Sequence, residues 1–103
     1  MDTIKREPTT VGEMLTEEFL KPLNMSQEFF GQKLGMSRKV INHICTDKRR
    51  LTFDEAVNMA ILLNTDPDFW INVQAAHDRW QARQEINKRI DNGVQPLFKA
   101  AHV

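Results

Sequence analysis

The short turn between two serine-headed segments is the feature that most constrains the fold of this chain. Ser26 precedes the segment 27–34 and Ser37 precedes the segment 38–46, and serine is among the preferred residues for capping the N-terminus of a helix. Gly35 lies between the segments, where glycine commonly takes the left-handed conformation that ends a helix. The sequence therefore predicts two short helices that meet at a tight turn.

Helical spacing of apolar residues predicts three further helices, at about 11–21, 53–64 and 67–92. Thr10 is the expected N-cap of the first of these, and Thr52 with Glu55 three residues later matches a capping box for the second. Asp66 is the expected N-cap of the third, with Pro67 at its first position. A helix of about 26 residues spans roughly 39 Å. Because β-type alternation is absent, we expect an all-α fold of five helices whose last helix is long.

The composition of the 103-residue chain, with 41% hydrophobic and 27% charged residues, is typical of a globular protein. We expect a flexible N-terminal segment at 1–10, one domain at 11–93 and a C-terminal tail at 94–103. The single cysteine excludes an internal disulfide, and no apolar run is long enough to cross a bilayer. These features favour a cytoplasmic protein with no membrane partner.

Charge is unevenly distributed, although the formal net charge is zero. Residues 37–50 contain five Lys or Arg and one acid, whereas residues 51–78 contain five acids and no Lys or Arg. Such a pattern predicts two electrostatically distinct surfaces. Solvated faces without a partner are the alternative explanation of the same pattern.

The predicted pair of short helices has the frame of a helix-turn-helix, in which the second helix enters a groove of DNA. Ile41 and Ile44 can face the core, which leaves the polar residues of the second helix outside. Four of these suit base edges, namely Arg38, Lys39, Asn42 and His43. Ser37 lies at a helix N-terminus that attracts phosphate, and the basic residues that follow the helix are Lys48, Arg49 and Arg50.

The stretch "MSQEFFGQKLGMSRKVINHICTDKR" resembles the helix-turn-helix of the phage-repressor and Cro-like superfamily. The chain is more narrowly similar to HigA-type antitoxins through "VGEMLTEEFLKPLNMS" before this stretch and "LLNTDPDFWINVQAAHDRWQAR" after it. The resemblance covers about residues 8–83. It implies an antitoxin that neutralises a basic toxin which cleaves messenger RNA on the ribosome, and that represses its own operon as a dimer on double-stranded operator DNA.

Carried onto this chain, the resemblance assigns base reading to Arg38, Lys39, Asn42 and His43. It assigns phosphate contacts to Gln27 and Thr46, with help from Lys48 and Arg49. Two positions depart from the family pattern. Gly31 replaces a frequent alanine, which predicts a close contact between helices. Asp47 stands in "TDK" where relatives have "NGK", at a position that often requires positive φ.

An apolar stripe on the last helix continues beyond what the other helices can cover. We expect this stripe and the tail to form an isologous dimer interface. The residues assigned to it are Trp80, Ile86, Ile90, Pro96, Leu97 and Phe98.

Acidic residues are the natural counterpart of a toxin that must present a basic surface to RNA. The acids of the first and fourth helices are therefore the candidate toxin contacts. They are Glu13, Glu17, Glu18, Asp54 and Glu55.

Two other functions fit the same residues. One is a stand-alone helix-turn-helix repressor without a toxin, and the other is a protein-interaction module that does not bind DNA. An enzyme is not expected, because no nucleophile motif or glycine-rich phosphate loop occurs. The spacing of His43 and Cys45 matches no zinc site, so that neither a metal nor another cofactor is predicted.

Overall fold

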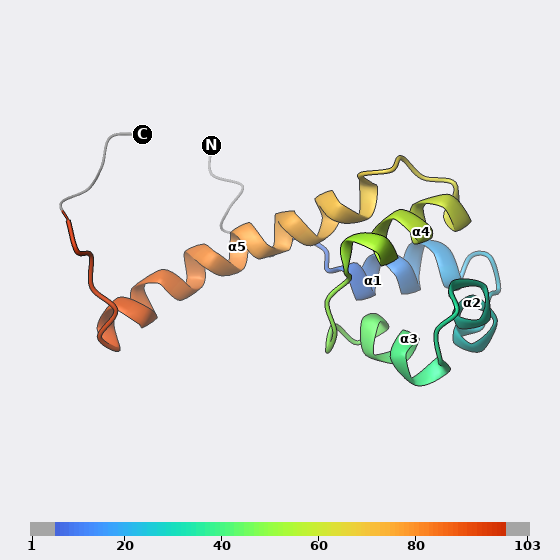
Figure 1. Ribbon diagram of the computed structural model, residues 1–103, viewed down its shortest axis with the longest axis horizontal. Helices are drawn as coiled ribbons and strands as arrows, with labels where there is room; N and C mark the ends of the chain where they lie inside the picture. The colour runs from blue at the N-terminus through green and yellow to red at the C-terminus, as the bar shows by residue number, and fades with distance from the viewer. Residues whose placement is uncertain (1–5, 99–103) are drawn as a thin grey trace.

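The structure of the chain is a computed structural model that describes residues 6–98, and the elements in that range are all helices (Figure 1). The predicted all-α fold is therefore confirmed. The elements are α1 (Val11–Leu15), the π-helical segment η2 (Thr16–Leu20), α2 (Gln27–Leu34), α3 (Arg38–Cys45), α4 (Phe53–Leu63) and α5 (Phe69–Asp91).

The first predicted helix, 11–21, consists of α1 followed directly by η2. The change to π-helix is marked by the bond from Lys21 N–H to the carbonyl of Thr16, five residues back, at 3.0 Å. Leu15, the N-cap of η2, and Leu20, its last residue, are both buried. The wider turns thus place a second leucine in the core, which apolar spacing at the α-helical period did not reveal.

Four N-caps predicted from the sequence are confirmed. Each cap oxygen accepts a hydrogen bond from a backbone N–H three residues later, at 3.0 to 3.2 Å. The caps are Thr10, Ser26, Ser37 and Thr52. The predicted capping box of Thr52 with Glu55 is present, and Thr10 forms a second one with Glu13.

Trp70 is the largest of the fully buried core side chains, and one or more residues of every other helix pack into the same cluster. Phe19 and Phe69 flank the Trp70 ring, with ring centroids 5.3 and 5.0 Å from it. The buried apolar residues are Val11, Leu15, Leu20, Phe30, Ile41, Ile44, Leu51, Ala56, Met59, Ala60 and Trp70. The first turn of α5 is therefore fixed to the helix-turn-helix through the core.

The start of α5 differs from the prediction. Asp68, not Asp66, is the N-cap, and its side chain makes no capping hydrogen bond. The carbonyl of Asp66 instead accepts from the N–H of Phe69 at 3.1 Å, which closes a turn over Pro67 before the helix begins. This turn aims Phe69 and Trp70 at the core, so burial of two aromatic rings outweighs the local capping preference.

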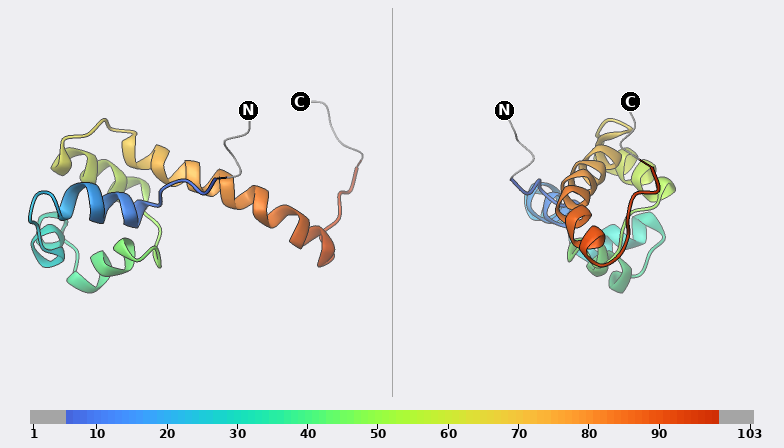
Figure 2. Two further views of the ribbon diagram at one scale, coloured as in Figure 1. Left: turned by 180° about the vertical axis from the view of Figure 1, so that it is seen from behind. Right: turned by 90° about the vertical axis from the view of Figure 1, so that its left-hand side faces the viewer.

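α5 runs well beyond the other helices (Figures 1 and 2). The molecule measures 51 × 29 × 22 Å, and its radius of gyration of 16.9 Å exceeds the value of about 13 Å for a compact domain of this length. Exposed apolar side chains continue along the protruding part and the tail, with Leu97 and Phe98 exposed by 90% and 82%. Within the described residues, no other helix therefore packs over the exposed apolar side chains of the C-terminal part.

Candidate nucleic-acid interface

α2 and α3 meet in a turn that only small residues permit. Gly35 ends α2 with φ of 71°, and the N–H of Met36 donates to the carbonyl of Gly31 at 2.8 Å. A Cβ on Gly31 would lie 2.6 Å from the Met36 carbonyl oxygen. The close helix contact predicted from Gly31 is thus present, and it holds α3 at a fixed angle to α2.

α3 presents a polar face to solvent. Ile41 and Ile44 are buried as predicted, and Arg38, Lys39 and Asn42 are exposed. The Asn42 amide donates to the side-chain oxygen of Gln27 at 3.2 Å, which joins the exposed faces of the two helices. His43 is only partly exposed, and therefore points less fully outward than expected.

The hydroxyls of Ser37 and Thr46 already have partners inside the protein. The Ser37 oxygen accepts from the N–H of Val40, and the Thr46 hydroxyl donates to the carbonyl of Asn42 at 2.8 Å. Lys48 is exposed, and its side chain has no hydrogen bond or ion pair among the described residues. Of the residues that follow α3, Lys48 is thus the most available to a phosphate.

Arg49 and Arg50 are held in two-pronged ion pairs. The Arg49 guanidinium donates to both carboxylate oxygens of Glu55 at 2.7 Å, with side-chain exposures of 34% and 17%. The Arg50 guanidinium donates to both oxygens of Asp78 at 2.5 and 2.7 Å. These hydrogen bonds lower the pKa of Glu55 and of Asp78 below their ordinary values. Arg49, assigned to DNA, and Glu55, assigned to the toxin, are therefore bound to each other.

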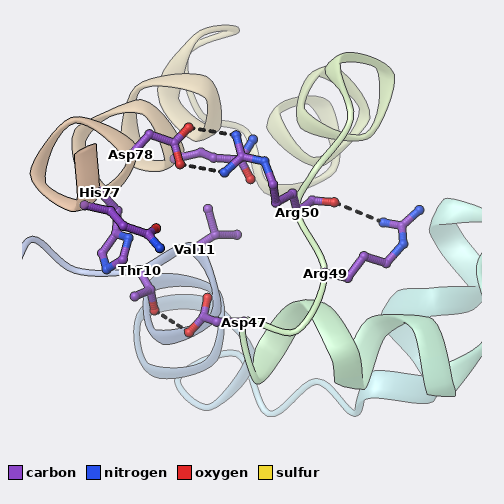
Figure 3. Close-up of a pocket in the computed structure, with 9 residues that line it drawn as sticks. Thr10, Val11, Asp47, Arg49, Arg50, His77 and Asp78 are labelled. Carbon is purple, nitrogen blue, oxygen red and sulfur yellow. Dashed lines mark hydrogen bonds and ion pairs between the residues drawn. The ribbon is translucent and has the colours of Figure 1, made fainter. Parts of the chain in front are cut away.

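A small cavity of about 200 Å³, lined mainly by polar residues, lies where the end of the helix-turn-helix meets α5 (Figure 3). Figure 3 shows Thr10 and Asp47 turned toward each other at one wall and Arg50 and Asp78 at another. Asp47 has φ of 59°, so the expectation of a positive φ at this position is confirmed. Gln74, also in the wall, exchanges two hydrogen bonds with the backbone of Leu51, at 2.9 and 3.1 Å.

The candidate toxin contacts are divided between two places. Glu13, Glu17 and Glu18 line one groove of about 590 Å³, together with the apolar residues Met14, Phe19 and Phe69. Glu13 also closes the capping box of α1, and Glu17 pairs with Lys21 at 2.8 Å. Asp54 lies in the first turn of α4 beside the paired Glu55. The freest acids of the set are thus Glu18 and Asp54, both exposed.

The candidate dimer residues are mostly exposed. Ile86, Pro96, Leu97 and Phe98 are exposed and Ile90 is partly buried. Trp80 is partly buried and packs on His77, with ring centroids 5.4 Å apart. His77 also forms a hydrogen bond with Glu7 at 2.8 Å, so that part of the N-terminal segment lies against α5 (Figure 2). The segments 1–5 and 99–103, which complete the predicted flexible segment and tail, lie outside the described residues.

The remaining polar chemistry is sparse. Burial raises the pKa of the partly buried Cys45 thiol, which suits a packing residue. Within residues 6–98 no three His, Cys, Asp or Glu side chains are grouped as metal ligands would be. In the same range, none of the helices combines the length and hydrophobicity needed to span a bilayer.

Two short capped helices in a tight turn, with exposed basic and amide side chains on the second, define a helix-turn-helix protein. Residues 17–70 match the family model described as "Helix-turn-helix". The chain is 34% identical over 98 residues to antitoxin HigA-1 of Vibrio cholerae, a match that covers 95% of this chain and 91% of that protein. This chain therefore belongs to the helix-turn-helix family, in the group of the HigA-type antitoxins.

Two further similarities support the helix-turn-helix family, and the second also supports the antitoxin group. An uncharacterised helix-turn-helix transcriptional regulator of Haemophilus influenzae is 37% identical over 97 residues, which cover 94% of this chain and 89% of that protein. The solved structure of the antitoxin GraA in complex with its operator has a TM-score of 0.74 at 33% identity, and the match covers 90% of this chain and 94% of that one.

Proposed function

We propose that this protein is an antitoxin that binds the operator of its own operon as a dimer and neutralises an RNA-cleaving toxin. The observation that carries the proposal is the exposed face of α3 with Arg38, Lys39 and Asn42, held by the tight turn to α2. The complex of the similar antitoxin GraA with its operator supports the DNA-binding part. The activity is one of binding, without a catalytic step.

In the proposed complex α3 lies in the major groove. Arg38 and Lys39 suit guanine and Asn42 suits adenine, and Gln27 keeps the Asn42 amide in place through their hydrogen bond. Lys48 neutralises the DNA backbone, and affinity should accordingly fall with salt. Arg49 contributes less than the resemblance implies, because its guanidinium is already bound to Glu55.

The proposed dimer is formed by the protruding part of α5 and the tail. Ile86, Leu97 and Phe98 are exposed apolar residues that the described chain does not cover. An isologous contact through them would place two recognition helices on one side of the duplex, with half-site centres about 34–36 Å apart or a multiple of that.

The proposed toxin is basic and cleaves messenger RNA on the ribosome. Its docking surface on this chain would be the groove of Glu13, Glu17 and Glu18, which acidic and apolar residues line together. Such a surface is separate from the face of α3 that reads DNA, and both partners could therefore be held together.

A gel-shift titration of the full chain on its own promoter, over a series of salt concentrations, tests the DNA-binding part. We expect salt-sensitive binding to an inverted repeat, and the absence of specific binding would contradict the proposal. Truncation after Arg83 should give a monomer in light scattering and lose most operator affinity. A truncated chain that stays dimeric would place the interface elsewhere.

A stand-alone repressor is the second candidate, favoured by the 37% identity to a transcriptional regulator. Both candidates predict operator binding, so the partner separates them. The antitoxin requires an adjacent reading frame for a small basic protein that co-purifies with this chain and is inhibited by it. The absence of such a frame would favour the stand-alone repressor.

A further inference from the structure

The link that follows the recognition helix is bound directly to α5. The Leu51 N–H donates to the Gln74 side-chain oxygen at 2.9 Å, and the Gln74 amide donates to the Leu51 carbonyl at 3.1 Å. One residue earlier, Arg50 forms its two-pronged ion pair with Asp78. Gln74 and Asp78 are four residues apart and therefore project from the same face of α5.

Along the described part of α5, these are the last hydrogen bonds and ion pairs that tie it to the helix-turn-helix. Within residues 79–98, the side-chain hydrogen bonds and ion pairs stay within α5 or between it and the tail, as in Glu85 with Lys88 and Arg89. The segment from Asp78 to the end of α5 rises about 20 Å. A tilt of about 10° at Asp78 would move its end by about 3 Å, close to the rise of about 3.4 Å per base pair of DNA.

We propose that Gln74 and Asp78 are positioning residues that set the half-site spacing which the protein accepts on its operator. They do so by fixing the direction in which α5 leaves the helix-turn-helix, and hence the separation of the two recognition helices in the dimer. The inference rests on the proposed operator-binding dimer formed through α5.

The two contacts contribute differently. The Gln74 side chain forms hydrogen bonds with both the N–H and the carbonyl of Leu51, and the Leu51 side chain is buried. Together these contacts fix the distance between the link and α5. The Arg50–Asp78 pair is exposed, so it adds little stability but limits rotation, because a planar guanidinium meets both carboxylate oxygens. Their loss should loosen the angle of α5 while Trp70 keeps the helix in the core.

The test compares full-length wild type with the double variant Gln74→Ala/Asp78→Ala. Asn72→Ala is the matched control, because Asn72 is an exposed residue of the same helix. Its side-chain amide has no hydrogen bond among the described residues. Fluorescence anisotropy would measure the Kd for the operator with its native half-site spacing, with spacings changed by one or two base pairs in either direction, and for a single half-site.

We expect wild type and Asn72→Ala to prefer the native spacing by about tenfold or more, since other spacings require the DNA to be twisted or bent. In the double variant this preference should fall to about threefold or less, while affinity for the single half-site stays within about twofold of wild type. A purely structural role would lower both affinities together.

A double variant that stays dimeric in light scattering and keeps the wild-type spacing preference would overturn the inference, and so would a wild type without any preference. If circular dichroism shows the double variant to be unfolded, the single variants Gln74→Ala and Asp78→Asn replace it, and wild-type preference in both would equally overturn the inference. Failure of the proposed function looks different, because wild type itself would then bind no operator or would be a monomer.

Discussion

Asp47 accepts a hydrogen bond from the Thr10 hydroxyl at 2.6 Å and another from the Gly12 N–H at 2.9 Å. The residue that follows the recognition helix thus supplies a second cap to the first helix, in addition to Thr10 itself. The departure from the family pattern at Asp47 therefore has a structural role, since the carboxylate joins the exit of α3 to the start of α1.

Asp47→Asn should destabilise the fold by about 1 kcal/mol. Asparagine tolerates the positive φ of this position, so the substitution does not strain the backbone. The lost stability therefore reports the contribution of the negative charge at the N-terminus of α1 and of its charge-assisted hydrogen bonds. Urea denaturation followed by circular dichroism would measure the change. Asp66→Asn is the control, because Asp66 is exposed and its side chain has no hydrogen bond among the described residues. Equal stability of both variants would show that Asp47 does not stabilise α1.

Gly12→Ala should cost about 1–3 kcal/mol, although alanine has the better helix propensity. A Cβ at this position would lie 2.4 Å from the carbonyl oxygen of Cys45 and 2.8 Å from that of Ile44. Both are backbone atoms at the end of α3, which cannot turn aside as a flexible side chain could. A thermal melt monitored by circular dichroism measures the effect, and an increase in Tm would contradict the close contact of α1 with α3.

Acid should weaken the fold partly through Glu55. Arg49 lowers the pKa of Glu55 in the folded state, so this group stabilises the protein above its unfolded pKa of about 4.3, and the contribution is lost as the pH falls through the folded value. Urea denaturation at pH 7 and at pH 3 should show a loss for wild type that exceeds the loss for Glu55→Gln by on the order of 1 kcal/mol. Equal losses would show that the pair does not contribute.

Replacement of the reading residues and of Lys48 should affect DNA binding in different ways. Arg38→Ala and Asn42→Ala should each cost about 1–3 kcal/mol and relax base preference at one position. Lys48→Ala should weaken all sequences alike and reduce the salt slope by about one. Gel-shift titrations over a salt series distinguish the two patterns. If the Arg38→Ala/Asn42→Ala double variant binds operator DNA as wild type does, this face of α3 does not read the bases.

Charge reversal of the candidate toxin contacts should slow association with the toxin. The structure restricts the suitable sites to Glu17, Glu18 and Asp54, because Glu13 and Glu55 close capping boxes and their reversal would also damage helices. The triple Lys variant should associate more slowly than wild type and with less dependence on salt. Surface plasmon resonance measures both. An unchanged rate with an intact circular dichroism spectrum would place toxin recognition on other residues.

Features that depend on neighbouring residues were predictable from the sequence. The limits of α2, α3 and α4 were predicted nearly correctly. They depend on the serine and threonine caps, on Gly35 and on apolar spacing, all of which act within a few residues. The same holds for the outward placement of Arg38, Lys39 and Asn42, which follows once Ile41 and Ile44 face the core.

Contacts between distant residues were not predictable in this way. The pairing of Arg50 with Asp78 and of Thr10 with Asp47 requires the helices to be placed first, because 28 and 37 residues separate the partners. The π-helical turns of η2 and the late start of α5 arise because burial of Leu20, Phe69 and Trp70 decides local geometry. The DNA, dimer and toxin roles of the assigned residues stay predictions, since each concerns a partner molecule.

The protruding end of α5 makes hydrogen exchange a reporter of assembly. In a single chain the amides beyond Asp78 are protected only by bonds within the helix, and a helical segment of about a dozen residues is marginal in water. Those amides would then exchange through local fraying, while amides near Trp70 exchange only when the whole domain opens. Slow exchange at Ile86 and Ile90 would therefore measure how much of the population has its last helix covered by another chain.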